Sequence, residues 1–127
     1  MLNDSRIVYV VDDDESVREA LRGLLKSAGF RADVFASAEE FLSSGRLGAT
    51  GCLIVDVRMP GMSGVELQEQ LIASNPALPI IFISADGDDG VRARALQRGA
   101  IDFLYKPFSD EALLDAIDRA SGTKSLP

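Results

Sequence analysis

Short β-rich segments alternate with amphipathic segments along the whole sequence, and this alternation limits the possible folds more than any other feature. The first, third and fourth β-rich segments are apolar throughout, which is typical of strands in a parallel sheet that helices cover on both faces. The predicted strands span residues 6–11, 31–35, 52–57, 78–85 and 100–105, and the predicted helices span 16–29, 37–45, 64–75, 89–99 and 109–121. We therefore predict an α/β fold, a doubly wound (βα)5 sandwich.

The length and composition suit one domain. The chain has 127 residues, of which 46% are hydrophobic, and this is enough for an ordinary hydrophobic core. We expect this domain to span residues 1–121, with 122–127 as a tail or the start of a linker. No apolar stretch approaches the roughly 18 to 20 residues that span a bilayer, and the first six residues lack the features of a signal peptide. These features predict a cytoplasmic protein without a membrane partner.

The residue types that are missing exclude several kinds of chemistry. The sequence has no histidine and a single cysteine, Cys52, which excludes disulfides, Cys/His zinc sites and histidine as base or phosphoryl carrier. The formal net charge of −7 argues against direct nucleic-acid binding by this chain, because phosphate contacts need a basic surface. Any chemistry must therefore use carboxylates, hydroxyls, lysine or arginine.

Polar residues stand at the carboxyl ends of four of the five predicted strands. They are Asp12, Asp13 and Asp14 after the first strand, Asp56 at the end of the third, Ser84 at the end of the fourth and Lys106 at the end of the fifth. Each has an ordinary explanation when taken alone, and Asp14 is expected to be only a helix-entry residue. Ligands of open α/β sheets bind beyond the carboxyl ends of the strands. The set as a whole therefore predicts a functional site at this edge.

These residue types suit phosphoryl transfer assisted by a divalent cation. Clustered carboxylates bind hard cations such as Mg²⁺, which uses few protein oxygens and keeps several waters. A carboxylate beside such a cation can attack a phosphoryl group. We expect Asp56 to be that nucleophile, because it stands alone on a central strand, whereas Asp12 and Asp13 are adjacent and better suited to hold metal. Ser84 and Lys106 could then contact the phosphoryl oxygens.

Four motifs in order resemble the receiver domain of two-component response regulators. They are "VVDDD" after the first strand, "DVRMPGMSG" after the third, "ISA" at the end of the fourth and "GAIDFLYKPF" around the fifth. The last motif is most similar in amino-acid sequence to receivers of nitrogen-fixation and LuxR-type transcription factors. The resemblance covers essentially the whole chain, and it implies a flavodoxin-like five-stranded parallel sheet of order 2-1-3-4-5.

The resemblance also implies roles at the site. Asp56 would be the phosphoacceptor and, with Asp13 and the backbone carbonyl of Arg58, would ligate Mg²⁺, for which Mn²⁺ could substitute. Asp12 would act through a bound water. Ser84 and Lys106 would hold the phosphoryl group, and Lys106–Pro107 would be a cis peptide.

A switch and its partners are further implications of the resemblance. Movement of Ser84 toward the phosphoryl group would let Phe103 rotate, changing the surface formed by the fourth helix, fifth strand and fifth helix and promoting homodimerisation or control of an output domain. The phosphoryl donor would be a sensor histidine kinase or a histidine phosphotransfer protein. The chain would catalyse its own phosphorylation and dephosphorylation without being a conventional enzyme. Arg58 and Asp86 would modulate hydrolysis, and we expect an ion pair between them across the site mouth.

One alternative from a different class is a metal-dependent phosphohydrolase with an aspartate nucleophile. Enzymes of the haloacid-dehalogenase type carry a second acid two residues after the nucleophile, where this chain has Arg58. A flavin-binding module of the same fold is also disfavoured, because "DDDES" after the first strand would repel a phosphate.

Overall fold

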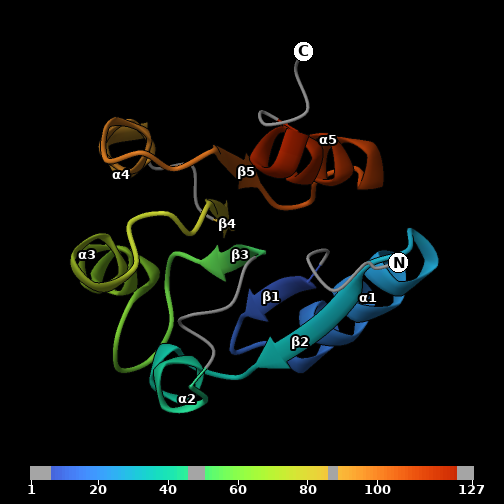
Figure 1. Cartoon of the computed structure of the whole chain (residues 1–127), viewed down its shortest axis with the longest axis horizontal. Coiled ribbons are helices and arrows are strands. Elements are labelled where there is room, and N and C mark those ends of the chain that lie inside the picture. The colour runs from blue at the N-terminus through green and yellow to red at the C-terminus, as the bar shows by residue number, and fades with distance from the viewer. Residues whose placement is uncertain (1–6, 46–50, 86–88, 123–127) are drawn as a thin grey trace.

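The computed structural model describes residues 7–45, 51–85 and 89–122, and it has ten elements in strict alternation (Figure 1). The strands are β1 (Ile7–Val11), β2 (Arg31–Phe35), β3 (Cys52–Asp56), β4 (Ile80–Ser84) and β5 (Asp102–Tyr105). The helices are α1 (Glu15–Ser27), α2 (Ala38–Ser43), α3 (Gly64–Ser74), α4 (Asp89–Gln97) and α5 (Asp110–Gly122). Every predicted strand and helix is present, so the alternating pattern was interpreted correctly.

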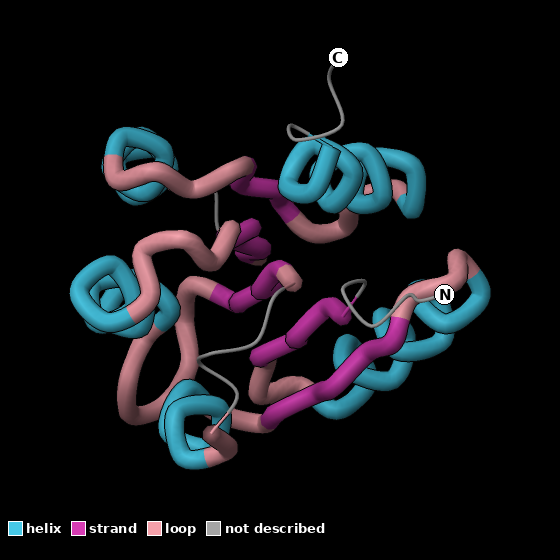
Figure 2. The backbone as a smooth tube through the Cα atoms, viewed as in Figure 1, coloured by secondary structure: helices cyan, strands magenta, loops and turns pink. Residues whose placement is uncertain are grey.

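The five strands form one parallel sheet in the order β2-β1-β3-β4-β5. Helices α2, α3 and α4 lie on one side of it, and α1 and α5 lie on the other (Figures 1 and 2). This confirms the predicted doubly wound sandwich and its strand order. Within the described ranges, no helix combines the length and apolar character needed to cross a bilayer.

Two hydrophobic cores, one on each face, follow from the alternation of side chains along the strands. In β1, Tyr9 and Val11 belong to the core under α2, α3 and α4, whereas Val8 and Val10 belong to the core under α1 and α5. Strands β3 and β4 are buried along their whole length, which explains their continuous apolar sequence. The edge strand β2 is only partly buried.

Side-chain caps set the starts of three helices. The side chain of Asp14 accepts a hydrogen bond from the backbone N–H of Ser16 (2.9 Å), so Asp14 is the predicted helix-entry residue. The Ser37 hydroxyl accepts one from the N–H of Glu40 (3.0 Å), which confirms the helix start predicted there. At α3, Ser63 and Glu66 form a reciprocal capping box.

The predicted boundaries of two strands were too early. Strand β4 begins at Ile80 instead of residue 78, since Pro79 has no N–H to donate to the sheet. Strand β5 begins at Asp102 instead of residue 100, since the N–H of Ala100 bonds to the carbonyl of Ala95 and still belongs to the end of α4.

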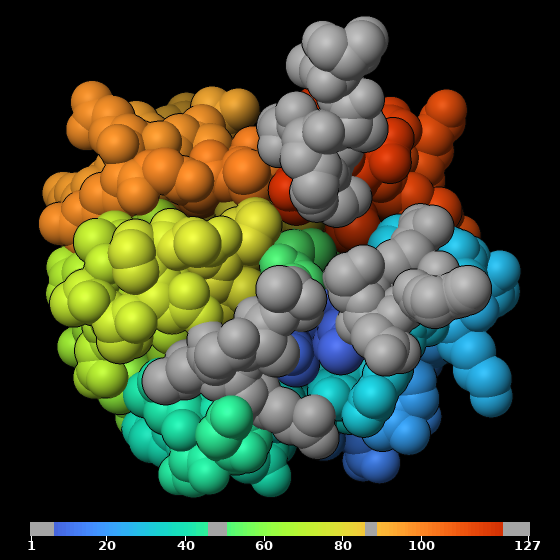
Figure 3. Space-filling model, viewed as in Figure 1, coloured from blue at the N-terminus to red at the C-terminus, as the bar shows by residue number. Residues whose placement is uncertain are grey.

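Helices α3 and α4 support each other on their shared face of the sheet. The buried amide of Gln68 donates to the backbone carbonyl of Ala95 (3.2 Å), and Arg98 forms an ion pair with Glu69 (2.7 Å). Figure 3 shows the yellow-green surface of α3 adjoining the orange surface of α4. The helix that follows β3 and the helix that follows β4 are therefore joined by direct contacts.

Gly64 at the start of α3 allows the chain to turn back against the end of β3. A Cβ on Gly64 would lie 2.3 Å from the backbone oxygen of Asp56, which is much closer than such contacts permit. Gly23 on α1 provides a contrast, since nothing lies within 4 Å of a Cβ there.

We predict opposite effects for alanine at these two glycines. Gly64→Ala should lower the free energy of unfolding by about 2–3 kcal/mol, because the new Cβ forces backbone to move. Gly23→Ala should raise it by about 0.5–1 kcal/mol, because alanine loses less conformational entropy in a helix. Urea denaturation of both variants checks this, and a neutral Gly64→Ala would contradict the close approach at the end of β3.

Candidate functional site

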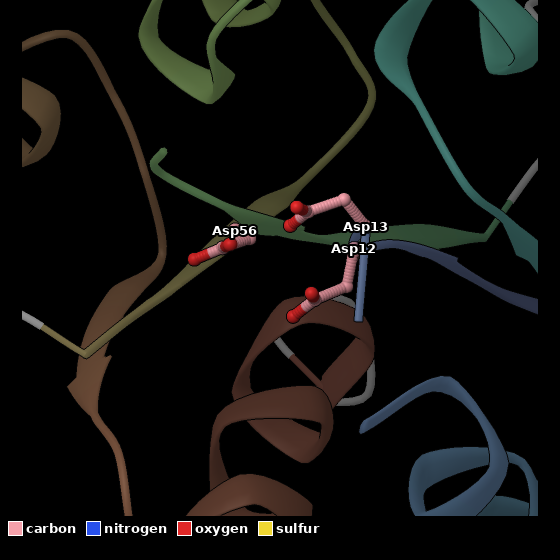
Figure 4. A group of neighbouring side chains, drawn as sticks. All are labelled: Asp12, Asp13 and Asp56. Atoms are coloured by element: carbon pink, nitrogen blue, oxygen red, sulfur yellow. The ribbon is translucent and has the colours of Figure 1, made fainter. Parts of the chain in front are cut away.

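Three carboxylates converge at the carboxyl ends of the two central strands β1 and β3. Val11 pairs with Val55 across these strands, so Asp12 follows β1 at the level where Asp56 ends β3. Asp13 is the next residue, and Figure 4 shows its carboxylate turned toward those of Asp12 and Asp56. Each of the three offers one oxygen, and these oxygens lie within 4.8 Å of one another. The sheet topology therefore brings together the carboxylates that the sequence predicted.

Asp12 and Asp13 differ in their surroundings, although the sequence analysis assigned both of them to metal binding. Asp12 is fully buried, and its carboxylate accepts hydrogen bonds from the backbone N–H of Asp14 (2.9 Å) and from Lys106 Nζ (3.0 Å). Its backbone oxygen accepts from the Arg18 guanidinium (2.8 Å). Asp13 is exposed. Asp12 thus belongs to the inner hydrogen-bond network, whereas Asp13 faces solvent at the site mouth.

Lys106 reaches the cluster from the end of β5. Its backbone N–H donates to the carbonyl of Ser84 (2.7 Å), and the peptide bond to Pro107 is cis, as the resemblance implied. Nζ lies 3.0 Å from Asp12 Oδ2 and 3.7 Å from Asp56 Oδ1. Burial alone would lower the pKa of Lys106, but the hydrogen bond to Asp12 and the charge of Asp12 outweigh it and raise that pKa. The lysine is therefore a fixed cation inside an acidic cluster.

The environment of Asp56 makes its ionised form costly. Burial is the largest cause, the charge of Asp12 adds to it, and Lys106 opposes both, so that the pKa of Asp56 rises from 3.8 to about 6. A raised folded-state pKa means that this carboxyl contributes most to stability below pH 3.8 and that the contribution is lost as the pH rises through about 6. At neutral pH the cluster is under electrostatic repulsion.

The donor set fits a divalent cation. With all three carboxylates ionised, Lys106 compensates one of three negative charges, and two remain. Carboxylate oxygens are the ligands that Mg²⁺ and similar hard cations prefer. A divalent cation among Asp12, Asp13 and Asp56 would remove the repulsion.

Ser84 and Phe103 lie on the two strands beyond β3. Asp56 pairs with Ile83, so Ser84 stands one residue further along the neighbouring strand, where it is buried. Phe103 is buried on β5 and packs against Phe82, with ring centroids 5.9 Å apart, and against Tyr105, at 5.4 Å. Ser84 is thus at the site edge, and Phe103 lies in the core beneath the β4–β5 pair.

Arg58 is exposed in the segment between β3 and α3, two residues after Asp56. Asp86 falls outside the described residues. The expected ion pair between them therefore stays a prediction.

Sequence reasoning missed three residues that shape the site. Arg18 holds the backbone of Asp12, Gly64 permits the close return after Asp56, and Glu39 contacts the segment after β3 (below). Arg18 and Glu39 look like ordinary surface charges in the sequence, since only tertiary contacts distinguish them. Gly64 could have been found, because a glycine that opens a helix after a serine cap is unusual and suggests close packing.

Comparison with known proteins identifies relatives for most of the chain. Response regulator protein TodT of Pseudomonas putida is 46% identical over 120 residues, covering 94% of this chain and 53% of TodT. Transcriptional regulatory protein FixJ of Bradyrhizobium diazoefficiens is 41% identical over 113 residues, covering 89% of this chain and 55% of FixJ. The chain therefore spans about half the length of the curated relatives it matches.

Solved structures agree with these matches. Response regulator StyR has a TM-score of 0.86 at 54% identity, covering 94% of this chain and 60% of StyR. The beryllofluoride-activated receiver domain dimer of NtrC4 has a TM-score of 0.87 at 30% identity, covering 93% of this chain and 98% of that chain. The model of the response regulator receiver domain family matches residues 8–118 of this chain. The sequence resemblance is thereby confirmed, including its likeness to the transcriptional regulatory protein FixJ, and the chain belongs to the response regulator receiver family.

Proposed function

We propose that this domain is a phosphorylation-dependent switch in which Asp56 accepts a phosphoryl group from a sensor histidine kinase or a histidine phosphotransfer protein. The observation that carries this proposal is the grouping of Asp56 with two further carboxylates and Lys106 at the carboxyl edge of the sheet. The phosphohydrolase alternative has no comparable support, because the residue two positions after Asp56 is the cation Arg58.

The transfer itself needs positioning and charge compensation more than acid–base chemistry. A carboxylate oxygen of Asp56 attacks phosphorus, the phosphorus–nitrogen bond of the donor phosphohistidine breaks, and the released imidazole nitrogen takes up a proton. Lys106 Nζ is already close to the Asp56 carboxylate and would bind a phosphoryl oxygen there. The Ser84 hydroxyl would bind another, because Ser84 ends the strand beside β3. Hydrolysis of the acyl phosphate would return the domain to its resting state, with Arg58 and Asp86 modulating its rate.

Mg²⁺, or Mn²⁺ in its place, is the proposed cofactor. Asp13, Asp56 and the backbone carbonyl of Arg58 would hold it, with Asp12 acting through a water because Lys106 already occupies its carboxylate. The ion would neutralise charge on the carboxylates and the incoming phosphoryl group. Its contribution explains how an acidic cluster can accept an anion.

The switch would act through Ser84 and Phe103 on the surface formed by α4, β5 and α5. The Phe103 ring contacts Tyr105, whose hydroxyl donates a hydrogen bond to Asp89 at the start of α4 (3.0 Å). Movement of Phe103 would therefore change the contacts on that surface.

A phosphorylation-dependent homodimer is part of the proposal, supported by the activated NtrC4 receiver domain, which is a dimer. A cytoplasmic location and the absence of direct nucleic-acid contacts by this chain also belong to it.

Phosphorylation by a small donor tests the proposal directly. Incubation with phosphoramidate and Mg²⁺ should add the mass of one phosphoryl group to the intact protein. Asp56→Asn should abolish this adduct, because an amide is a poor nucleophile, whereas Asp14→Asn should keep it, because Asp14 caps α1. An adduct that persists in Asp56→Asn would overturn Asp56 as the acceptor.

A Mg²⁺ titration tests the metal site. Asp13→Ala should weaken Mg²⁺ affinity by at least about tenfold, because it removes a charged ligand. Asp14→Asn should leave the affinity close to that of the wild type, although it changes the charge of the adjacent residue. Equal losses in both variants would indicate a diffuse charge effect instead of a defined site.

A further inference from the structure

The segment between β3 and α3, residues 57–63, determines where the carbonyl of Arg58 lies. At its base, the N–H of Gly64 donates to the carbonyl of Val57 (2.9 Å). The Met59 side chain is buried in the core under α2, α3 and α4. A backbone carbonyl cannot be reoriented by a side-chain rotamer, so its direction depends on the conformation of the whole segment.

Glu39 of α2 holds the far side of this segment. Its Oε2 atom accepts a hydrogen bond from the backbone N–H of Met62 (3.0 Å), across 23 positions of sequence. Gly61 has a φ of 76°, and a Cβ there would lie 2.7 Å from the same oxygen. The carboxylate therefore lies against the Gly61–Met62 turn. Figure 1 shows the green chain after β3 passing beside α2.

The backbone of Glu39 is itself well anchored. The neighbouring residues Ala38 and Phe41 are fully buried, and the Phe41 ring packs against Tyr9 and Phe35 with centroids 5.6 Å and 5.3 Å away. Since Tyr9 and Phe35 belong to β1 and β2, helix α2 is fixed to the sheet. Through α2, Glu39 thus links the sheet to the Gly61–Met62 turn of the segment.

We infer that Glu39 is a positioning residue for the cation site, acting by holding the 57–63 segment so that the Arg58 carbonyl faces the cluster. The inference rests on the proposed function, in which that carbonyl is a metal ligand. Glu39 acts through the segment and lies on a helix that contributes none of the proposed ligands. Its effect should appear in metal affinity without a matching loss of overall stability.

Glu40 offers a matched control on the same helix. Its carboxylate accepts a hydrogen bond from the N–H of Ala36 (2.6 Å), a contact local to the start of α2. Both glutamates lie in the first turn of α2, so each interacts similarly with the helix dipole. The difference between them is the contact with the segment after β3.

The experiment is a Mg²⁺ titration of the whole chain, followed by NMR, for the wild type and Glu39→Ala, Glu39→Gln, Glu40→Ala and Asp13→Ala. Glu39→Ala should weaken Mg²⁺ affinity by about tenfold, as outer-shell changes do. Glu39→Gln should stay within about twofold of the wild type, because its amide oxygen accepts the same hydrogen bond. Glu40→Ala should bind Mg²⁺ like the wild type. Urea unfolding should show equal small losses for Glu39→Ala and Glu40→Ala.

Each contrary outcome overturns a different statement. If Asp13→Ala loses Mg²⁺ affinity and Glu39→Ala does not, the positioning role is wrong and the proposed metal site stands. If Glu39→Gln is as weak as Glu39→Ala, the carboxylate acts through its charge, and the positioning role is again wrong. If Asp13→Ala binds Mg²⁺ like the wild type, the proposed metal site fails, and the role of Glu39 fails with it.

Discussion

Repulsion among the carboxylates at the end of the sheet is the constraint on which the site depends. Asp12 is fully buried beside Asp56, and such a pair is tolerated only because Lys106 and the backbone N–H of Asp14 compensate Asp12. The lysine comes from a position 94 residues away, so the ion pair requires β1, β3, β4 and β5 to be assembled in their observed order. Fold and site are thus specified together.

The same repulsion is only partly compensated at neutral pH. Lys106 compensates only part of the negative charge, and the pKa of Asp56 rises to about 6, chiefly through burial and then through Asp12. The domain therefore retains an electrostatic cost at neutral pH that a bound divalent cation would remove. In the proposed switch, binding of the cation and the phosphoryl group would relieve this repulsion, and a state that binds them more tightly would become more populated.

Much of the fold and the central residues of the site could be predicted from sequence. Continuous apolar strands between amphipathic helices indicated a covered parallel sheet, and the carboxyl-edge rule placed Asp12, Asp13, Asp56, Ser84 and Lys106 at one rim. The different burial of Asp12 and Asp13 could not be predicted, because adjacent residues after a strand carry no signal of which one turns inward. The contact of Glu39 with Met62 was also invisible, since it joins an exposed glutamate to a turn that only the tertiary fold brings near. The early boundary predicted for β4 came from reading apolar character through Pro79, which has no N–H to donate.

An NMR titration of the Asp56 carboxyl carbon with and without Mg²⁺ tests the central claim most directly. Without metal, the pKa should be about 6, well above the ordinary aspartate value. Saturating Mg²⁺ should move it below its ordinary range, because a ligated carboxylate is held in its charged form. A metal-free pKa at the ordinary value would contradict the account of a repulsive site, and an elevated pKa unchanged by Mg²⁺ would contradict the cation site.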